Sequence, residues 1–192
     1  MANHCYNFIE LSGEPDTLNM LCEKIIEEER KEYKYLVDKL DSILMKKQRK
    51  DSQKHYMYYG SRWFDITVSY DGDRNLLVQG DSAWSPLITF IEELCIQYSL
   101  QATYDYEEPG CDIAGVYEFN EEGYVEHTDM TYQEYRYKTD VGSWMDEQID
   151  YYRDLIDWED SDEKEIKEEI NKIEYASDKV KEELIEELLN KK

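Results

Sequence analysis

The sequence predicts an α+β protein in which an antiparallel sheet carries helices on one face and is followed by an acidic helical extension. Three observations lead to this prediction. Short segments in which large apolar residues alternate with polar ones recur through residues 1–132. Two segments with helical spacing interrupt them, and residues 133–192 show helical spacing alone. The third observation is charge, because the chain becomes strongly acidic from residue 104 onward.

The first expected strand is CYNFIEL, residues 5–11, whose large apolar side chains occupy alternate positions. Gly13 ends this strand, and Pro15 suits the first position of a helix. Helical spacing then continues over residues 15–47, as one long helix or as two. An exposed polar link is expected at 46–54, where lysine and glutamine are frequent.

A β-hairpin is expected next, because the strand-like runs at 62–70 and 76–80 are separated by the turn sequence DGDRN. Pro86 is placed to open a second helix with Ser85 as its N-cap, and a strand follows at 100–107. The resulting order βαββαβ is the split unit of the ferredoxin-like fold, an antiparallel sheet with two helices on one face.

A second hairpin, at 113–119 and 124–132, is expected to extend this sheet. Beyond it, residues 143–160 and 162–189 have the spacing of two helices. The second of these carries an apolar seam formed by Ile166, Ile170, Ile173, Val180 and Leu184. The seam covers about three heptads, which fits either a helix packed on the domain or a short homodimerising helix.

The charge limits the kinds of partner. The formal net charge is −24, and residues 104–169 hold 23 acidic and 5 basic side chains. Such a surface repels nucleic acids and anionic membranes and attracts basic proteins. The sequence has no bilayer-spanning apolar run and no signal-peptide pattern, so we expect a cytoplasmic protein. Its four scattered cysteines are expected to be free thiols.

The sequence contains no recognisable catalytic motif. The three histidines stand in no metal-ligand spacing, and the phosphate-binding and nucleophile-elbow patterns are missing. We therefore predict no catalytic residue, no metal and no cofactor. Trp63 and Trp84, at a strand start and a helix entry, are expected to make core or staple contacts, with ligand stacking as the alternative.

One short stretch, DYEEPGCDIAG at 105–115, gathers four carboxylates around a Pro-Gly turn. Strand alternation places Asp105 and Glu107 on one side of the sheet, and Tyr104 and Tyr106 on the other. A metal cup, an acid–base pair, an acidic recognition surface and a plain turn all remain open for this stretch. The oxygen spacing of an EF-hand loop is missing from it.

Four fragments together resemble a known family. They are MANHCYN at the start, YGSRWFD at 59–65, SAWSPL at 82–87 and YEEPGCDIAG at 106–115. Their order and spacing are similar to those of the YubB-type ferredoxin-like domain family of phages and conjugative plasmids, over roughly residues 1–130. This sequence departs from the pattern at Tyr59, Arg62 and Leu87, and the acidic helices lie outside it. The resemblance implies a fold and a mobile-element origin, but assigns no activity.

We therefore predict a non-enzymatic acidic binding protein. It would inhibit or modulate a basic host defence protein that handles nucleic acid, with nucleic-acid mimicry as one mode of action, and would not bind nucleic acid or membranes itself. The residues predicted to bind the partner are Glu107, Glu108, Asp146, Glu147, Asp150, Asp154, Asp157, Trp158, Glu159 and Asp160. Two alternatives stay open. One is a metal- or ligand-dependent enzyme with a carboxylate site at Glu107–Asp112. The other is an oligomeric component assembled as a homodimer through residues 162–189.

Overall fold

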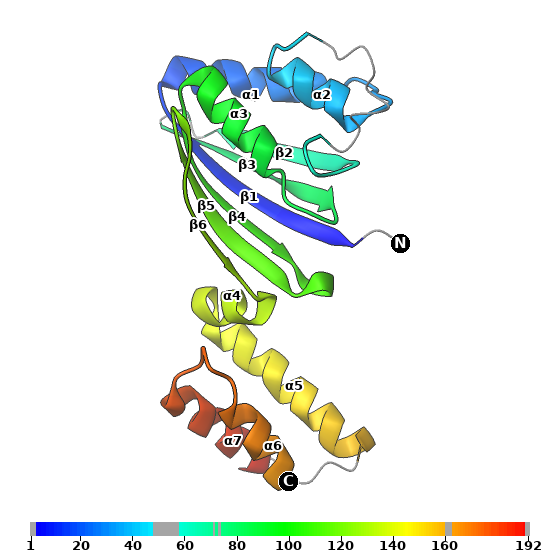
Figure 1. Cartoon of the computed structure of the whole chain (residues 1–192), viewed down its shortest axis with the longest axis vertical. Helices are drawn as coiled ribbons and strands as arrows, with labels where there is room; N and C mark the ends of the chain where they lie inside the picture. Colours follow the sequence, from blue (N-terminus) through cyan, green and yellow to red (C-terminus); the bar gives the residue numbers. More distant parts are fainter. Residues whose placement is uncertain (1–2, 48–57, 71, 73, 160–162, 191–192) are drawn as a thin grey trace. The chain divides into compact units, whose positions relative to one another are not determined.

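A computed structural model describes residues 3–47, 58–70, 72, 74–159 and 163–190 of the chain (Figure 1). The chain divides into two compact units, Met1–Met130 and Thr131–Lys192. The sequence placed this boundary two residues later, between residues 132 and 133.

The first unit contains a six-stranded antiparallel sheet with the order β2-β3-β1-β4-β5-β6. Its strands are β1 (His4–Ser12), β2 (Phe64–Tyr70), β3 (Asn75–Ala83), β4 (Gln101–Glu108), β5 (Ile113–Asn120) and β6 (Gly123–Met130). The first four strands have the order and connections of the ferredoxin-like fold. The hairpin β5–β6 extends the sheet beyond β4, so the predicted α+β architecture is confirmed.

Helices cover one face of this sheet and leave the other open (Figure 1). They are α1 (Pro15–Glu29), α2 (Leu36–Ile43) and α3 (Ile88–Tyr98). Strand alternation produces the two faces: on β1, Cys5, Ile9 and Leu11 are fully buried, whereas His4, Tyr6 and Phe8 are exposed. The core therefore lies between the helices and one side of the sheet.

The segment 15–47 forms two helices, and a buried carboxylate marks the point where the first one ends. Glu28 is fully buried in the last turn of α1 and is bound by Lys24 at 2.6 Å, Lys31 at 3.0 Å and the hydroxyl of Tyr33. Burial alone opposes ionisation of Glu28, but these three donors outweigh it and lower its pKa to about 2. The donors that follow the helix therefore fold the chain back onto its end.

The predicted N-cap of the third helix is wrong. Helix α3 begins at Ile88, two residues after Pro86, and its N-terminus receives no side-chain cap. The Ser85 hydroxyl instead donates to the backbone carbonyl of Gly60 at 2.5 Å. Its role is to join two loops at the end of the sheet.

The second unit consists of helices. They are α4 (Tyr132–Thr139), α5 (Val141–Glu159), α6 (Glu163–Asn171) and α7 (Asp178–Asn190). The expected single helix at 162–189 is wrong, because a turn at 172–177 divides it. Most of the predicted seam is used inside this unit, since Ile166, Ile170 and Leu184 pack with Trp144 and Tyr152 in its core. Among the described residues, no helix has the length and apolar character needed to cross a membrane.

Candidate functional site

The four sequence fragments meet at one end of the sheet in the first unit. The backbone N–H of Trp84 donates to the Asn3 carbonyl at 3.0 Å, and the Asn3 amide lies 3.8 Å from the Cys111 sulfur. The backbone N–H of Ala83 is bound by the Ser61 hydroxyl at 2.8 Å. The four fragments, which are distant in the sequence, are therefore joined by contacts in the fold.

A buried polar network lies beneath this end of the sheet, with Asn7 at its centre. The Asn7 amide donates to the Gly80 carbonyl at 2.9 Å and to the Ser82 hydroxyl at 3.0 Å. It accepts a hydrogen bond of 2.5 Å from the hydroxyl of Tyr104, which in turn accepts from the backbone N–H of Leu87 at 2.7 Å. These bonds satisfy buried groups and fix strand positions, so the network is structural.

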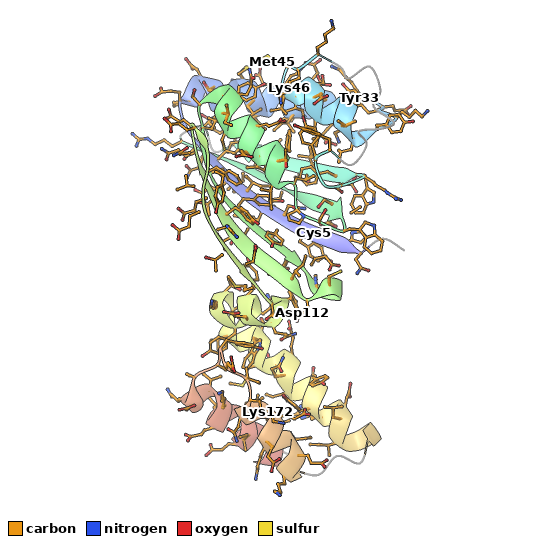
Figure 2. The ribbon with its side chains drawn as sticks, in the orientation of Figure 1. Cys5, Tyr33, Met45, Lys46, Asp112 and Lys172 are labelled. Atoms are coloured by element: carbon orange, nitrogen blue, oxygen red, sulfur yellow. The ribbon has the colours of Figure 1, made fainter. Side chains whose placement is uncertain are left out.

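Two buried thiols of the first unit are poor nucleophiles. Cys5 is fully buried on β1 (Figure 2), and burial raises its pKa to about 12. Burial raises the pKa of Cys95 to about 12 as well. Both cysteines therefore remain protonated thiols near neutral pH, whereas reactive cysteines are stabilised as thiolates.

The DYEEPGCDIAG stretch forms the end of β4, a short 3-10 turn (Pro109–Cys111) that Asp112 follows, and the start of β5 (Figure 2). Tyr104 and Tyr106 are buried beneath the helices, and Asp105 and Glu107 lie on the open face, as alternation predicted. Gly115 is required here, because a Cβ atom at this position would lie 2.7 Å from the Tyr106 ring. Of the described residues, no three His, Cys, Asp or Glu side chains are grouped to hold a metal ion.

The assignment of Glu108 to the partner-binding surface is wrong. Strand β4 continues one residue further than predicted, so alternation turns Glu108 toward the helix side, where it is 1% exposed. No described N–H or O–H group donates to either of its carboxyl oxygens. Glu108 therefore lies next to the core and cannot contact a partner.

Trp84 also departs from its prediction. It has a backbone φ of +73° and is 46% exposed. The left-handed region is costly for a residue with a Cβ atom. The hydrogen bonds of the neighbouring Ala83 and Ser85 hold this backbone in place, so the ring faces solvent at the end of the sheet.

The open face of the sheet carries a concentrated negative charge. We call this surface the acidic sheet face. Its carboxylates are Glu10, Asp65, Asp81, Asp105, Glu107, Glu118 and Glu126. None of the described strand residues is Lys or Arg. Of this set, only Glu107 was predicted from the sequence as a binding residue. The other six can be assigned to one surface only from the register of the strands.

Two aromatic side chains occupy the centre of the acidic sheet face. Tyr6 and Phe8, at alternate positions of β1, are 46% and 40% exposed. The register places Tyr6 opposite Asp81 on β3 and Glu107 on β4. Alternate residues of one strand point the same way, so both rings face solvent, Tyr6 between two carboxylates and Phe8 beside one.

The second unit holds the other predicted binding residues on α5. Asp146, Asp150 and Asp154 recur every fourth residue and are exposed. Glu147 is half-buried and pairs with Arg136 at 3.1 Å. The side chains of Asp157, Trp158 and Glu159, and all of Asp160, lie outside the described residues. The described part of the predicted α5 surface is thus a row of three aspartates.

The fold defines the class of this protein as a ferredoxin-like α+β domain with an added hairpin. The chain belongs to the Api92-like protein family, because the family model described as "Ferredoxin-like domain in Api92-like protein" matches residues 59–178. That match includes most of the helical extension, which lay outside the resemblance seen in the sequence. A solved structure, of protein api92 from Yersinia pseudotuberculosis, is similar with 10% identity and a TM-score of 0.45. The likeness covers 67% of this chain and 98% of that one. No curated protein matches the chain.

Proposed function

We propose that this chain is a non-catalytic binding protein that holds a basic protein on its acidic sheet face. The observation that carries the proposal is the concentration of seven carboxylates, with no Lys or Arg among the described strand residues. Oppositely charged surfaces steer each other into contact and exclude partners of like charge.

Within this proposal, the partner class that fits best is a basic protein that itself binds nucleic acid, since such proteins carry clustered cationic surfaces. The resemblance to proteins of phages and conjugative plasmids supports a role in restraining a host protein of this kind, such as a defence nuclease. This step rests on association and not on geometry.

The spacing of the carboxylates indicates whether the surface resembles a DNA backbone or is a more general charged docking surface. On an α-helix, residues four apart are separated by about 6 Å along the axis. The aspartate row of α5 therefore carries charge at roughly half the density of one DNA strand, which has a phosphate every ~3.4 Å. The acidic sheet face spreads its charges in two dimensions, with strands about 4.8 Å apart. Both arrangements favour a charged docking surface over a close copy of a duplex backbone.

The test neutralises the sheet face and compares it with a matched change elsewhere. The variant Asp81→Asn/Asp105→Asn/Glu107→Gln removes three carboxylates from the face. The control Glu14→Gln/Glu23→Gln/Glu32→Gln removes three exposed carboxylates from the helix side and changes the net charge equally. The probe is a short arginine- and lysine-containing peptide titrated against each full-length protein by calorimetry.

We expect the face variant to bind the peptide about tenfold more weakly than the control at low salt, at ~0.5 kcal/mol for each exposed charge pair. Raising the salt concentration should weaken binding to the wild type more than binding to the face variant. Equal binding by the face variant and the control would refute the proposal, because only the total charge would then matter.

A further inference from the structure

The two exposed rings on β1 require an explanation that charge alone does not give. Tyr6 and Phe8 lie at the centre of the sheet, and their side chains point away from the core. A solubilising surface would place polar side chains there. Exposed aromatic rings on the central strand are instead suited to stacking against a planar group of a partner.

We propose that the acidic sheet face recognises arginine side chains, with Tyr6 and Phe8 stacking on the guanidinium groups and the flanking carboxylates accepting their N–H bonds. This inference rests on the proposed function and names the chemistry of the partner. The guanidinium group is planar, stacks on aromatic faces and offers paired donors that match a carboxylate. A lysine ammonium is a compact, strongly hydrated charge without a face to stack.

The strand register supplies the paired acceptors. Asp81 and Glu107 lie on the strands to either side of Tyr6. Phe8 has Asp105 on one side and Gln79 on the other. Neighbouring strands are about 4.8 Å apart, so a guanidinium stacked on either ring lies within reach of a carboxylate. Tyr6 therefore has a carboxylate on both sides, and one of these, Asp81, also pairs with the His4 ring at 3.2 Å. A guanidinium stacked on Tyr6 has more acceptors within reach than one stacked on Phe8.

The same geometry restricts the spacing of arginines in the partner. Tyr6 and Phe8 are two residues apart on one strand, which corresponds to about 6.7 Å. In an extended peptide, side chains at alternate positions have this spacing and the same direction. A shallow hollow of about 210 Å³, lined by Glu10, Thr103 and Glu118 among others, lies on the acidic sheet face. The spacing of Tyr6 and Phe8, and not this hollow, fits an extended segment with arginine at every second residue.

Single-stranded RNA is the competing occupant, because ferredoxin-like sheets of the RRM type stack bases on exposed aromatics. Two features of this sheet disfavour RNA. The open-face positions of β3 next to the rings hold Leu77, Gln79 and Asp81, none of which is aromatic. An RNA-binding surface needs cationic side chains to contact phosphates, but the described strands of this sheet carry carboxylates and no Lys or Arg, and carboxylates repel a nucleic-acid backbone.

The experiment uses the full chain and three probes: a short peptide with arginine at alternate positions, its lysine counterpart, and a single-stranded RNA oligonucleotide. The variant Tyr6→Leu/Phe8→Leu keeps apolar bulk and removes the aromatic faces. The control Tyr151→Leu removes an exposed ring from the second unit. Urea unfolding of each variant verifies that it is folded.

We expect the wild type to bind the arginine peptide more tightly than the lysine peptide. The double variant should lose about tenfold in arginine affinity and much less in lysine affinity, whereas Tyr151→Leu should change neither. Equal loss for both peptides, or no loss, would refute arginine recognition. If arginine recognition were refuted in this way but the Asp81/Asp105/Glu107 variant still bound the peptides more weakly than the wild type, the proposed function would be retained and only the preference for arginine would be wrong. Tighter binding of the RNA than of the arginine peptide would overturn both.

Discussion

The buried carboxylate at the end of α1 leads to a quantitative prediction about stability and pH. Glu28 is fully buried, and hydrogen bonds from Lys24, Tyr33 and Lys31 lower its pKa from 4.5 to about 2. One pKa unit corresponds to about 1.4 kcal/mol, so ionised Glu28 stabilises the fold by about 3 kcal/mol relative to its protonated form. We therefore expect Glu28→Gln to lower the free energy of unfolding by about this amount at pH 7.

The pH dependence separates this effect from ordinary loss of packing. Because the folded-state pKa of Glu28 is depressed, its contribution is complete above pH 4.5 and is lost as the pH falls toward 2. The difference in unfolding free energy between the wild type and Glu28→Gln should shrink over that range. Many other carboxylates titrate in the same window, but their effects are shared by both proteins and cancel in the difference.

The assay is urea unfolding of both proteins, followed by fluorescence at a series of pH values from neutral to about 2.5. Glu32→Gln, which changes an exposed acid just beyond the same helix end, serves as the control and should alter stability by less than about 0.5 kcal/mol. A destabilisation by Glu28→Gln that stays constant with pH would show that shape, and not the charge of Glu28, accounts for the effect.

Two further predictions concern the end of the sheet where the sequence fragments meet. Glu108→Met should raise the urea midpoint, corresponding to about 1–2 kcal/mol, because it replaces buried polar atoms that no described N–H or O–H group binds with apolar ones; a lower midpoint would show that the contact between the Cys111 thiol and Glu108 stabilises this turn. In the folded protein, a disulfide reagent should modify exposed Cys111 first, partly buried Cys22 more slowly, and buried Cys5 and Cys95 only on unfolding. The variant Cys111→Ser should lose the fast phase, and a fast phase that survives this substitution would contradict the predicted order.

The sequence predicts the succession of strands and helices along the chain, and it predicts the face that most strand residues take because alternation is a local property. Asp105 and Tyr106 took their predicted sides for this reason. The error at Glu108 has the same origin, since one additional strand residue moves a side chain to the opposite face. Trp84 could not be placed from sequence, because its left-handed backbone depends on contacts with distant loops.

Helix ends were predicted less well than strands, and tertiary contacts explain why. The break after α1 depends on Tyr33 and Lys31 turning back to Glu28, which no spacing rule anticipates. The division of 162–189 into α6 and α7 likewise lets Ile170 and Leu184 enter one core. A heptad-like spacing fits an intermolecular seam and an intramolecular one equally well, so the sequence alone could not choose between them.

Two physical effects contribute to binding at the acidic sheet face: long-range attraction by net charge and short-range contacts with the aromatic rings. A net charge of −24 accelerates the approach of any cation and is sensitive to salt. It does not discriminate between arginine and lysine, since both carry one positive charge. Discrimination requires short-range groups with shape, and among the described residues of this face Tyr6 and Phe8 offer large flat aromatic surfaces next to carboxylates. Removing carboxylates should therefore act mainly on the association rate, whereas removing the rings should act mainly on dissociation.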